Sequence, residues 1–452
     1  MHRLLYVAVM AAFFDQFSQM PLIAPYAHRL GVPSFLAGLI VGAYSLTNLT
    51  GNLAAGRWLD GGRRKGVLVL GLALAALGAG AYAPAETAAQ LALARLVHGF
   101  GAGLVTPAAF ALLGDHGEST HRGQIMAGAG AAIGLASVVG PAYGGLLAQR
   151  LGPGWVFATT AALLFLVTMV VARWVRDEEV AASHGPARRT GLAAGGGDMA
   201  AYGNPALAAA QAPQGSSPSP ARSPAPGGRR APEPGAPAAP RTTPLWRNTA
   251  LRLAYLGALA LMFALGLLVY TLPAKVAALS AGPAATGMLL SLFGLTAIAL
   301  FLSPASRLSD RWGRVRPLLA GLLAVAAALA GLAAFGSLPG LALAMVVFGT
   351  GFALVFPAAA ALVVDATGRG QRGRAFGLFY ACFSVAVVAG SAAAGALGHP
   401  TWTFLAGTAA VGILAVLLAW TGRALTGQAS PAAAAGQDGQ GPPASGRPLG
   451  LR

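Results

Sequence analysis

The chain has 452 residues, of which 56% are hydrophobic and 10% charged, and its mean hydropathy is +0.65. This composition excludes a water-soluble globular domain. The formal net charge of +17 would suggest a nucleic-acid partner in a soluble protein, but the basic residues lie at the ends of apolar segments and in one proline-rich stretch. That placement is typical of membrane topology, so we expect contact with membrane lipid and no binding of nucleic acid.

Twelve segments are apolar over about 20 residues, which is the length that an α-helix needs to cross the hydrocarbon of a bilayer. We therefore predict an all-α membrane protein with helices near 4–26, 34–56, 66–84, 89–113, 124–148, 154–174, 253–273, 284–305, 316–335, 338–363, 374–397 and 402–421. The single cysteine, Cys382, lies within one of these segments. It cannot form an intrachain disulfide, and we expect neither a metal nor a cofactor.

The first segment begins as a signal peptide would. Asp15 and Gln16 interrupt its apolar run, and no small-residue cleavage site follows, so we expect a retained helix. Asp15 and Gln19 are four residues apart and share one helix face. Pro21 and Pro25 should loosen the helix beyond this pair.

Arg95 and His98 lie in the fourth segment. A buried arginine in a membrane helix costs several kcal/mol unless it is paired or lines a wet cavity, so we interpret Arg95 as functional, the alternative being a structural hydrogen-bond hub. His98 can exchange a proton near neutral pH, although a helix histidine often satisfies only a local hydrogen bond. Together with Asp15 they are the candidate proton-coupling residues. Arg95 is the candidate partner of Asp15, and a purely structural Asp15–Arg95 pair is the alternative.

Basic residues in the predicted short loops are distributed unequally between the two faces of the membrane. One face carries Arg57, Arg63, Arg64, Lys65, Arg122, Arg307, Arg311, Arg314, Arg316, Arg369, Arg372 and Arg374. The other carries Arg29, Arg150 and Lys275. Cationic residues near helix ends are retained in the cytoplasm, so we expect both termini to be cytoplasmic and the protein to lie in the plasma (inner) membrane.

Residues 177–247 are rich in Pro, Gly, Ala, Ser and Arg, with too little apolar bulk to offset the entropy of ordering. We predict a disordered cytoplasmic linker there and a disordered tail over 427–452. Residues 1–176 and 248–426 then form two bundles of six helices each.

The two bundles repeat one another. Five pairs of landmark residues share an offset of 250 positions: Asp60 and Asp310, Asp115 and Asp365, Arg122 and Arg372, Gly140 and Gly390, Gly145 and Gly395. Duplicated halves are how many transporters build a central site.

Three further patterns resemble the major facilitator superfamily. The loop Ser306-Arg307-Leu308-Ser309-Asp310-Arg311-Trp312-Gly313-Arg314 is similar to its small-x-x-x-Asp-Arg-x-Gly-Arg signature, and the first-half counterpart keeps Gly56, Asp60 and Arg64 but lacks an arginine after the aspartate. Arg95 to Gly99 resembles the family's Arg-x-x-x-Gly pattern. Gly140-Pro141-Ala142-Tyr143-Gly144-Gly145 resembles its proton-antiporter motif.

The resemblance implies a twelve-helix fold with alternating access. It implies a conformational latch at Gly56, Asp60, Arg64, Asp310, Arg311, Gly313 and Arg314. It also implies that Gly140, Pro141, Gly144 and Gly145 belong to a helix that rocks against a neighbour, because proline kinks a helix and glycine permits backbone contact. Glycine packing of this kind is also common in membranes without any such motion.

Few polar residues and several aromatic ones are available to line a central cavity. We predict its lining as Gln19, Tyr44, Asn48, Tyr255, Tyr270, Phe356 and Tyr380. Such a lining suits an amphipathic or lipophilic solute better than a sugar, whose hydroxyls would need many partners.

The leading interpretation is therefore a monomeric, proton-coupled exporter of small organic compounds. The alternative within transporters is a metabolite uptake symporter or uniporter. An integral-membrane enzyme would need clustered catalytic groups, and the sequence has no His-Glu pair at metal spacing, no P-loop and no nucleophile elbow. A receptor or scaffold would have no evident use for a duplicated latch.

Overall fold

The computed structural model describes residues 2–59, 63–115, 122–175, 247–303 and 313–427, and every regular element within them is a helix. The helices are α1 (His2–Gln19), α2 (Ile23–Arg29), α3 (Ser34–Leu59), α4 (Arg64–Ala81), α5 (Ala88–Asp115), α6 (Arg122–Leu151), α7 (Pro153–Trp174), α9 (Thr249–Ala277), α10 (Pro283–Leu302), α12 (Val315–Ala334), α13 (Leu338–Asp365), α14 (Arg369–Leu397) and α15 (Pro400–Gly427). The predicted linker and tail lie almost wholly outside these residues.

Ten of these helices are long and apolar enough to cross a membrane. The pair α1 and α2 adds an eleventh span, bent by 48° at the break that contains Pro21. A proline lacks the N–H that a helix needs, which explains the break. The remaining predicted segment, 34–56, corresponds to α3, which has the length of a span but does not meet the same apolarity criterion. It carries polar residues such as Asn48 and Asn52. The prediction of a helical membrane fold is confirmed, and its count of twelve is matched only when α3 is included.

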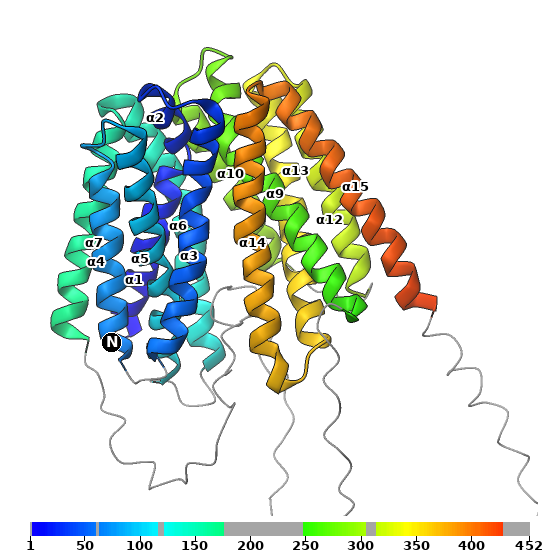
Figure 1. Cartoon of the computed structure of the whole chain (residues 1–452), viewed down its shortest axis with the longest axis horizontal. Helices are drawn as coiled ribbons and strands as arrows, with labels where there is room; N and C mark the ends of the chain where they lie inside the picture. Colours follow the sequence, from blue (N-terminus) through cyan, green and yellow to red (C-terminus); the bar gives the residue numbers. More distant parts are fainter. Residues whose placement is uncertain (1, 60–62, 116–121, 176–246, 304–312, 428–452) are drawn as a thin grey trace, which may run out of the picture.

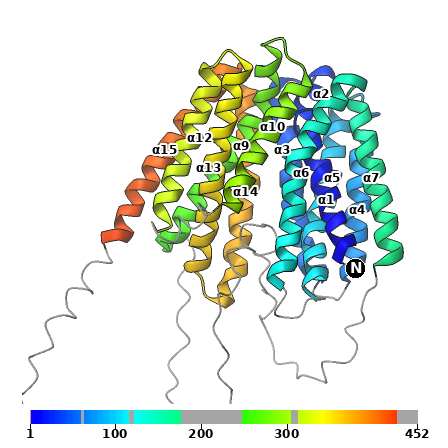
Figure 2. The same ribbon diagram turned by 180° about the vertical axis from the view of Figure 1, so that it is seen from behind.

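The chain forms two helical halves (Figures 1 and 2). Helices α1 to α7 form one half and α9 to α15 the other, each around its own apolar core. We call the end at which α1 begins the inner end and the end that holds α2 the outer end, following the expected orientation. In both views the halves lie close together at the outer end and diverge toward the inner end.

Two helix pairs join the halves, α3 with α14 and α6 with α10. Gly38 of α3 lies against the backbone of Ser391 in α14, and Gly287 of α10 lies against the carbonyl of Pro141 in α6. A side chain at either glycine would overlap the facing carbonyl oxygen, so only glycine permits this approach. Pro141 and Ser391 are separated by the same 250 positions as the sequence repeat, so α6 and α14 contribute equivalent positions to the two seams.

A third apolar cluster lies at the outer end and draws on both halves. Leu22, Ile23 and Ala27 come from the first half, and Leu267 and Tyr270 from α9. This cluster closes the space between the halves on the outer side.

Candidate functional site

A cavity of about 240 Å³ lies between the halves, on the inner side of the shared cluster. The first half supplies most of its polar lining, namely Gln16, Gln19, Tyr44, Ser45, Asn48, Asn52 and Arg95. The second half supplies a largely apolar wall with two hydroxyl groups, namely Met262, Leu265, Gly266, Val269, Tyr380, Phe383, Ser384 and Val387. One side of a bound molecule would therefore meet hydrogen-bonding groups and the other side would meet hydrocarbon.

A chain of buried polar side chains begins at this cavity and runs into the first half. Gln19 Nε2 donates to Asp15 Oδ1 at 2.6 Å, and Asp15 Oδ2 lies 2.6 Å from His98 Nε2. His98 Nδ1 lies 2.8 Å from the hydroxyl of Tyr82. Asp15 and Tyr82 are fully buried, and His98 and Gln19 are 1% exposed. Ionisable residues buried within membrane helices are rare and indicate a functional site.

The side chain of Arg95 contacts other groups than the expected Asp15 carboxylate. Its Nη2 donates to the Val41 carbonyl at 2.9 Å and its Nε to the Ile40 carbonyl at 3.4 Å. The guanidinium lies 4.8 Å from the centre of the Tyr44 ring, a cation–π distance. The expected ion pair between Asp15 and Arg95 is wrong, because the side chain that the structure places beside the Asp15 carboxylate is His98, while Arg95 donates to carbonyls of α3.

Three polar atoms of the cavity lining have no hydrogen-bond partner among the described residues. They are Gln19 Oε1, the Tyr44 hydroxyl and the Tyr380 hydroxyl. A buried polar group without a partner costs free energy, so native proteins leave few of them. Three such atoms leave free hydrogen-bonding capacity on the lining of this cavity.

The remaining residues predicted for the cavity lie elsewhere. Tyr255 donates to the Ala375 carbonyl at 3.1 Å within the second half. Phe356 stacks on Phe352 with ring centres 5.7 Å apart in the core of that half. Aromatic residues on a membrane helix do not reveal by spacing alone whether they face a cavity or a core.

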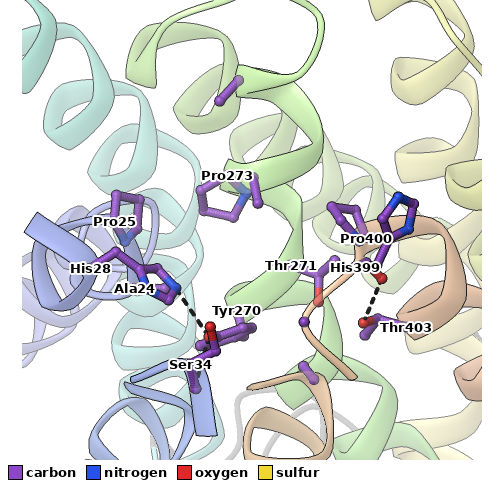
Figure 3. Close-up of a pocket in the computed structure, with 14 residues that line it drawn as sticks. Ala24, Pro25, His28, Ser34, Tyr270, Thr271, Pro273, His399, Pro400 and Thr403 are labelled. Carbon is purple, nitrogen blue, oxygen red and sulfur yellow. Dashed lines mark hydrogen bonds between the residues drawn. The ribbon is translucent and has the colours of Figure 1, made fainter. Parts of the chain in front are cut away.

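Tyr270 lines a second cavity of about 300 Å³ at the outer end (Figure 3). Its hydroxyl donates to the Ser34 carbonyl at 2.9 Å and lies 3.1 Å from His28 Nε2. These hydrogen bonds join α9 of the second half to α2 and α3 of the first. Residues of α9 up to Val269 line the central cavity, and those from Tyr270 onward line the outer one.

The latch residues are only partly described. Asp60, Asp310 and Arg311 lie outside the described residues, while Gly56 lies in α3 and Arg64 begins α4. Gly313 has a positive φ of 75°, and the Nε of the following Arg314 lies 3.1 Å from Asp365 Oδ2 at the end of α13. The side chains of this pair are 31% and 54% exposed, so the ion pair lies in contact with water.

The antiporter-like motif lies where α6 meets two other helices. Gly140 and Gly144 pack against α1 at Phe14 to Ser18, the turn that holds Asp15. Gly145 packs against the start of α10 in the second half. Helix α6 thus connects the buried polar chain to the seam between the halves.

Tyr82 is a member of the polar chain that sequence reasoning missed. It lies just beyond α4, and its hydroxyl turns inward to His98. A tyrosine at the end of a membrane helix is typical of the lipid interface, so its sequence position carries no sign of this contact.

Comparisons with known proteins agree with this architecture. The sequence matches the Major Facilitator Superfamily over residues 5–277 and 254–448. Multidrug resistance protein 2 of Bacillus subtilis is 26% identical over 178 residues, 37% of this chain and 43% of that protein. The quinolone resistance protein NorA of Staphylococcus aureus is 26% identical over 145 residues, 32% of this chain and 37% of that protein. The chain matches less than half of the length of these curated relatives.

Solved structures share the fold at low identity. A peptide transporter bound to alafosfalin has a TM-score of 0.68 at 16% identity, covering 92% of this chain and 93% of that one. The human organic anion transporter MFSD10 has a TM-score of 0.56 at 21% identity, covering 92% and 98%. Because the family match extends over both halves of the chain, this multi-pass membrane protein belongs to the major facilitator superfamily.

Proposed function

We propose that the protein is a proton-coupled exporter of small amphipathic or lipophilic organic compounds that works by alternating access. The observation that carries this proposal is a cavity between the halves whose polar wall contains Gln19, bound directly to the buried carboxylate of Asp15. A carboxylate inside a membrane protein is functional by default, because burying its charge is costly. Here the side chain of Gln19 alone separates the Asp15 carboxylate from the cavity that a substrate would fill.

The cavity and the relatives both support export of amphipathic compounds. Its apolar wall and its few polar atoms match molecules with a hydrophobic body and one or two polar groups. Relatives named for resistance to multiple drugs or to quinolones match parts of the chain. With both termini in the cytoplasm, the closed outer end of the fold corresponds to a state that loads from inside.

In the proposed cycle, Asp15 is the group that gains and loses the transported proton. The inner-facing protein takes up a solute while Asp15 is a carboxylate that accepts a hydrogen bond from Gln19 and lies against the His98 ring. The halves then rock about the α3–α14 and α6–α10 seams, and the solute leaves on the outer side. A proton taken up by Asp15 neutralises it and favours the return, during which the proton is released inside. We further expect a monomer in the plasma membrane.

The direction of transport can be tested in an efflux-deficient bacterium that expresses the protein. We expect resistance to some members of a panel of lipophilic cations, antibiotics and dyes, and extrusion that a protonophore abolishes. Resistance without any effect of the protonophore would refute proton coupling. Accumulation instead of extrusion would favour the uptake alternative.

The role of Asp15 can be tested in proteoliposomes with an imposed pH gradient. Asp15→Asn keeps the shape and the bond to Gln19 but cannot exchange a proton, so we expect a folded variant that binds substrate and loses gradient-driven transport. Glu86→Gln is the matched control, because Glu86 is an exposed carboxylate outside the helices. Full gradient-driven transport by a folded Asp15→Asn protein would exclude Asp15 as the required proton carrier.

A further inference from the structure

The outer cavity of about 300 Å³ takes no part in the transport cycle proposed above. Its walls belong to different halves, with His28 and Ser34 on one side and residues of α9, α14 and α15 on the other (Figure 3). Among the described residues, it shares no lining residue with the central cavity. His28 and His399 are exposed at the outer end of the fold, so the cavity is open to outer water.

The lining of this outer cavity combines apolar walls with a few hydrogen-bonding groups, as small-molecule sites do. Half of its residues are alanine or proline. The side chain of Thr271 also lines it, is 3% exposed, and has a hydroxyl oxygen without a hydrogen-bond partner among the described residues. Buried polar groups are usually hydrogen-bonded, so Thr271 has free hydrogen-bonding capacity on the cavity wall.

The charged groups around the cavity favour an anion. The described lining contains no acidic residue, and it contains two histidines, His28 of the first half and His399 of the second. Its remaining titratable group is the Tyr270 hydroxyl, which is bonded to both Ser34 and His28. The titratable or charged side chains described elsewhere at the outer end are Tyr26, Arg29, Tyr82, Glu86, Arg150 and Lys275. Three of these are cations, and the carboxylate of Glu86 lies outside the lining.

The backbone around the cavity favours an anion as well. Helix α3 begins at Ser34 and α15 at Pro400, and both residues line the cavity. The start of a helix carries a partial positive charge and N–H groups without partners in the helix. Helices α9 and α14 end at the cavity, where the carbonyl of Ala394, for example, accepts from the N–H of Gly398 at 3.1 Å. The partial negative charge of such helix ends is therefore reduced by capping.

Acid adds charge to this lining without breaking the link between the halves. The Ser34 carbonyl can only accept, so the Tyr270 hydroxyl donates its hydrogen there, and the Tyr270 oxygen accepts from His28 Nε2. A further proton on His28 goes to Nδ1 and leaves that bond in place. Histidine is the side chain that ordinarily changes its charge between about pH 5 and pH 8. A more acidic outer solution therefore makes the closed cavity more positive.

We propose that the outer cavity is a second ligand site, which takes a small organic carboxylate with an apolar body from the outer side. The carboxylate accepts a hydrogen bond from Thr271 and is attracted by the protonated rings of His28 and His399, and the apolar body lies against the alanine and proline walls. Because the two walls belong to different halves, the bound molecule favours the closed outer end. This inference goes beyond the proposed function and does not depend on the direction of transport.

The probe is 1-naphthoate, which stays an anion between pH 5.5 and pH 8 because carboxylic acids titrate near about pH 4. Its binding to the purified full-length protein is measured by calorimetry at about pH 5.5 and pH 8, the range in which histidine changes charge. We expect binding about tenfold tighter at the lower pH, the order of a hydrogen bond to a charged group. The 1-naphthylmethylammonium ion, a cation of similar shape, should show no such gain.

Variants in each half separate the contributions. His28→Gln and His399→Gln each remove one titratable ring, and glutamine keeps an N–H donor for Tyr270, so each should reduce the gain at low pH and the double variant should abolish it. His2→Gln, at the inner end, is the control and should keep the gain. Thr271→Val should weaken binding at both pH values. Its matched control is Thr168→Val, because the buried Thr168 hydroxyl bonds within α7.

Hydrogen–deuterium exchange then locates the bound probe. We expect 1-naphthoate to slow exchange at the starts of both α3 and α15. Slowing at the central cavity instead, or in one half alone, would overturn the inference. So would a parent affinity that does not rise at low pH, or a full gain in a double variant that thermal unfolding shows to be folded. These measurements do not involve transport, so failure of the exporter proposal, seen as protonophore-insensitive movement of solute, is distinguishable from failure of this one.

Discussion

The hydroxyl of Tyr270 links the two halves at the outer end, and removing it should favour opening of that end. Tyr270→Phe keeps the ring and deletes the hydrogen bonds to the Ser34 carbonyl and to His28. Each contributes about 1 kcal/mol net. Both together shift the equilibrium between the states by about 2 kcal/mol, which is roughly 30-fold in their ratio.

The shift can be measured by double electron–electron resonance with spin labels at Glu86 and Gly336. These positions lie in the outer loops of the two halves and are related by the repeat of 250 residues. The native Cys382 is first replaced by serine. We expect a longer-distance population to grow in Tyr270→Phe relative to the parent.

Tyr143→Phe is the control, because its hydroxyl donates to Thr159 at 2.7 Å within the first half and so should not affect the distance between halves. Unchanged distances in Tyr270→Phe would refute the reasoning. A shift of equal size in Tyr143→Phe would do the same, since it would point to general loosening rather than to the link across the halves.

Three further outcomes can be checked. Gly38→Leu should abolish folded protein on size-exclusion chromatography, because the side chain would overlap the backbone of α14, while Gly377→Leu, with open space around it, should be tolerated. Asp365→Asn should lower thermal stability in detergent by less than about 1 kcal/mol, since its pair with Arg314 is exposed. Replacing residues 180–240 with a flexible spacer should leave membrane insertion unchanged, because that composition cannot form a core.

Local pattern predicted the part of the site that lies on one helix, and it failed where partners come from distant helices. Asp15 and Gln19 share a face by their spacing, and the structure joins them by a hydrogen bond. The partner of Asp15 was expected to be Arg95 on grounds of charge alone. Which residue of α5 reaches α1 depends on how the two helices are rotated and shifted against each other. Arg95 and His98 are three positions apart and lie on nearly the same face of α5, so charge and spacing alone do not decide between them.

Fold class was predictable because the bilayer demands long apolar helices, and the weakening of the first span beyond Gln19 was predictable because proline removes an N–H. The helix count was harder, since α3 combines the length of a span with polar residues that line the cavity. A hydropathy criterion is therefore weakest at a helix that supplies polar residues to the central cavity.

The broken repeat at Pro141 has a consequence for how the halves slide past one another. Proline disturbs the ladder of α6, and the next amide, Ala142 N–H, donates across the seam to Ser291 Oγ at 3.0 Å. At the equivalent place in α14, the Ser391 hydroxyl bonds to carbonyls of its own helix. When its helices slide, the α6–α10 seam must therefore break the hydrogen bond between Ala142 and Ser291. At the α3–α14 seam the glycine contacts can slide without breaking this kind of bond. When the halves rock, we therefore expect the α6–α10 seam to open later than the α3–α14 seam.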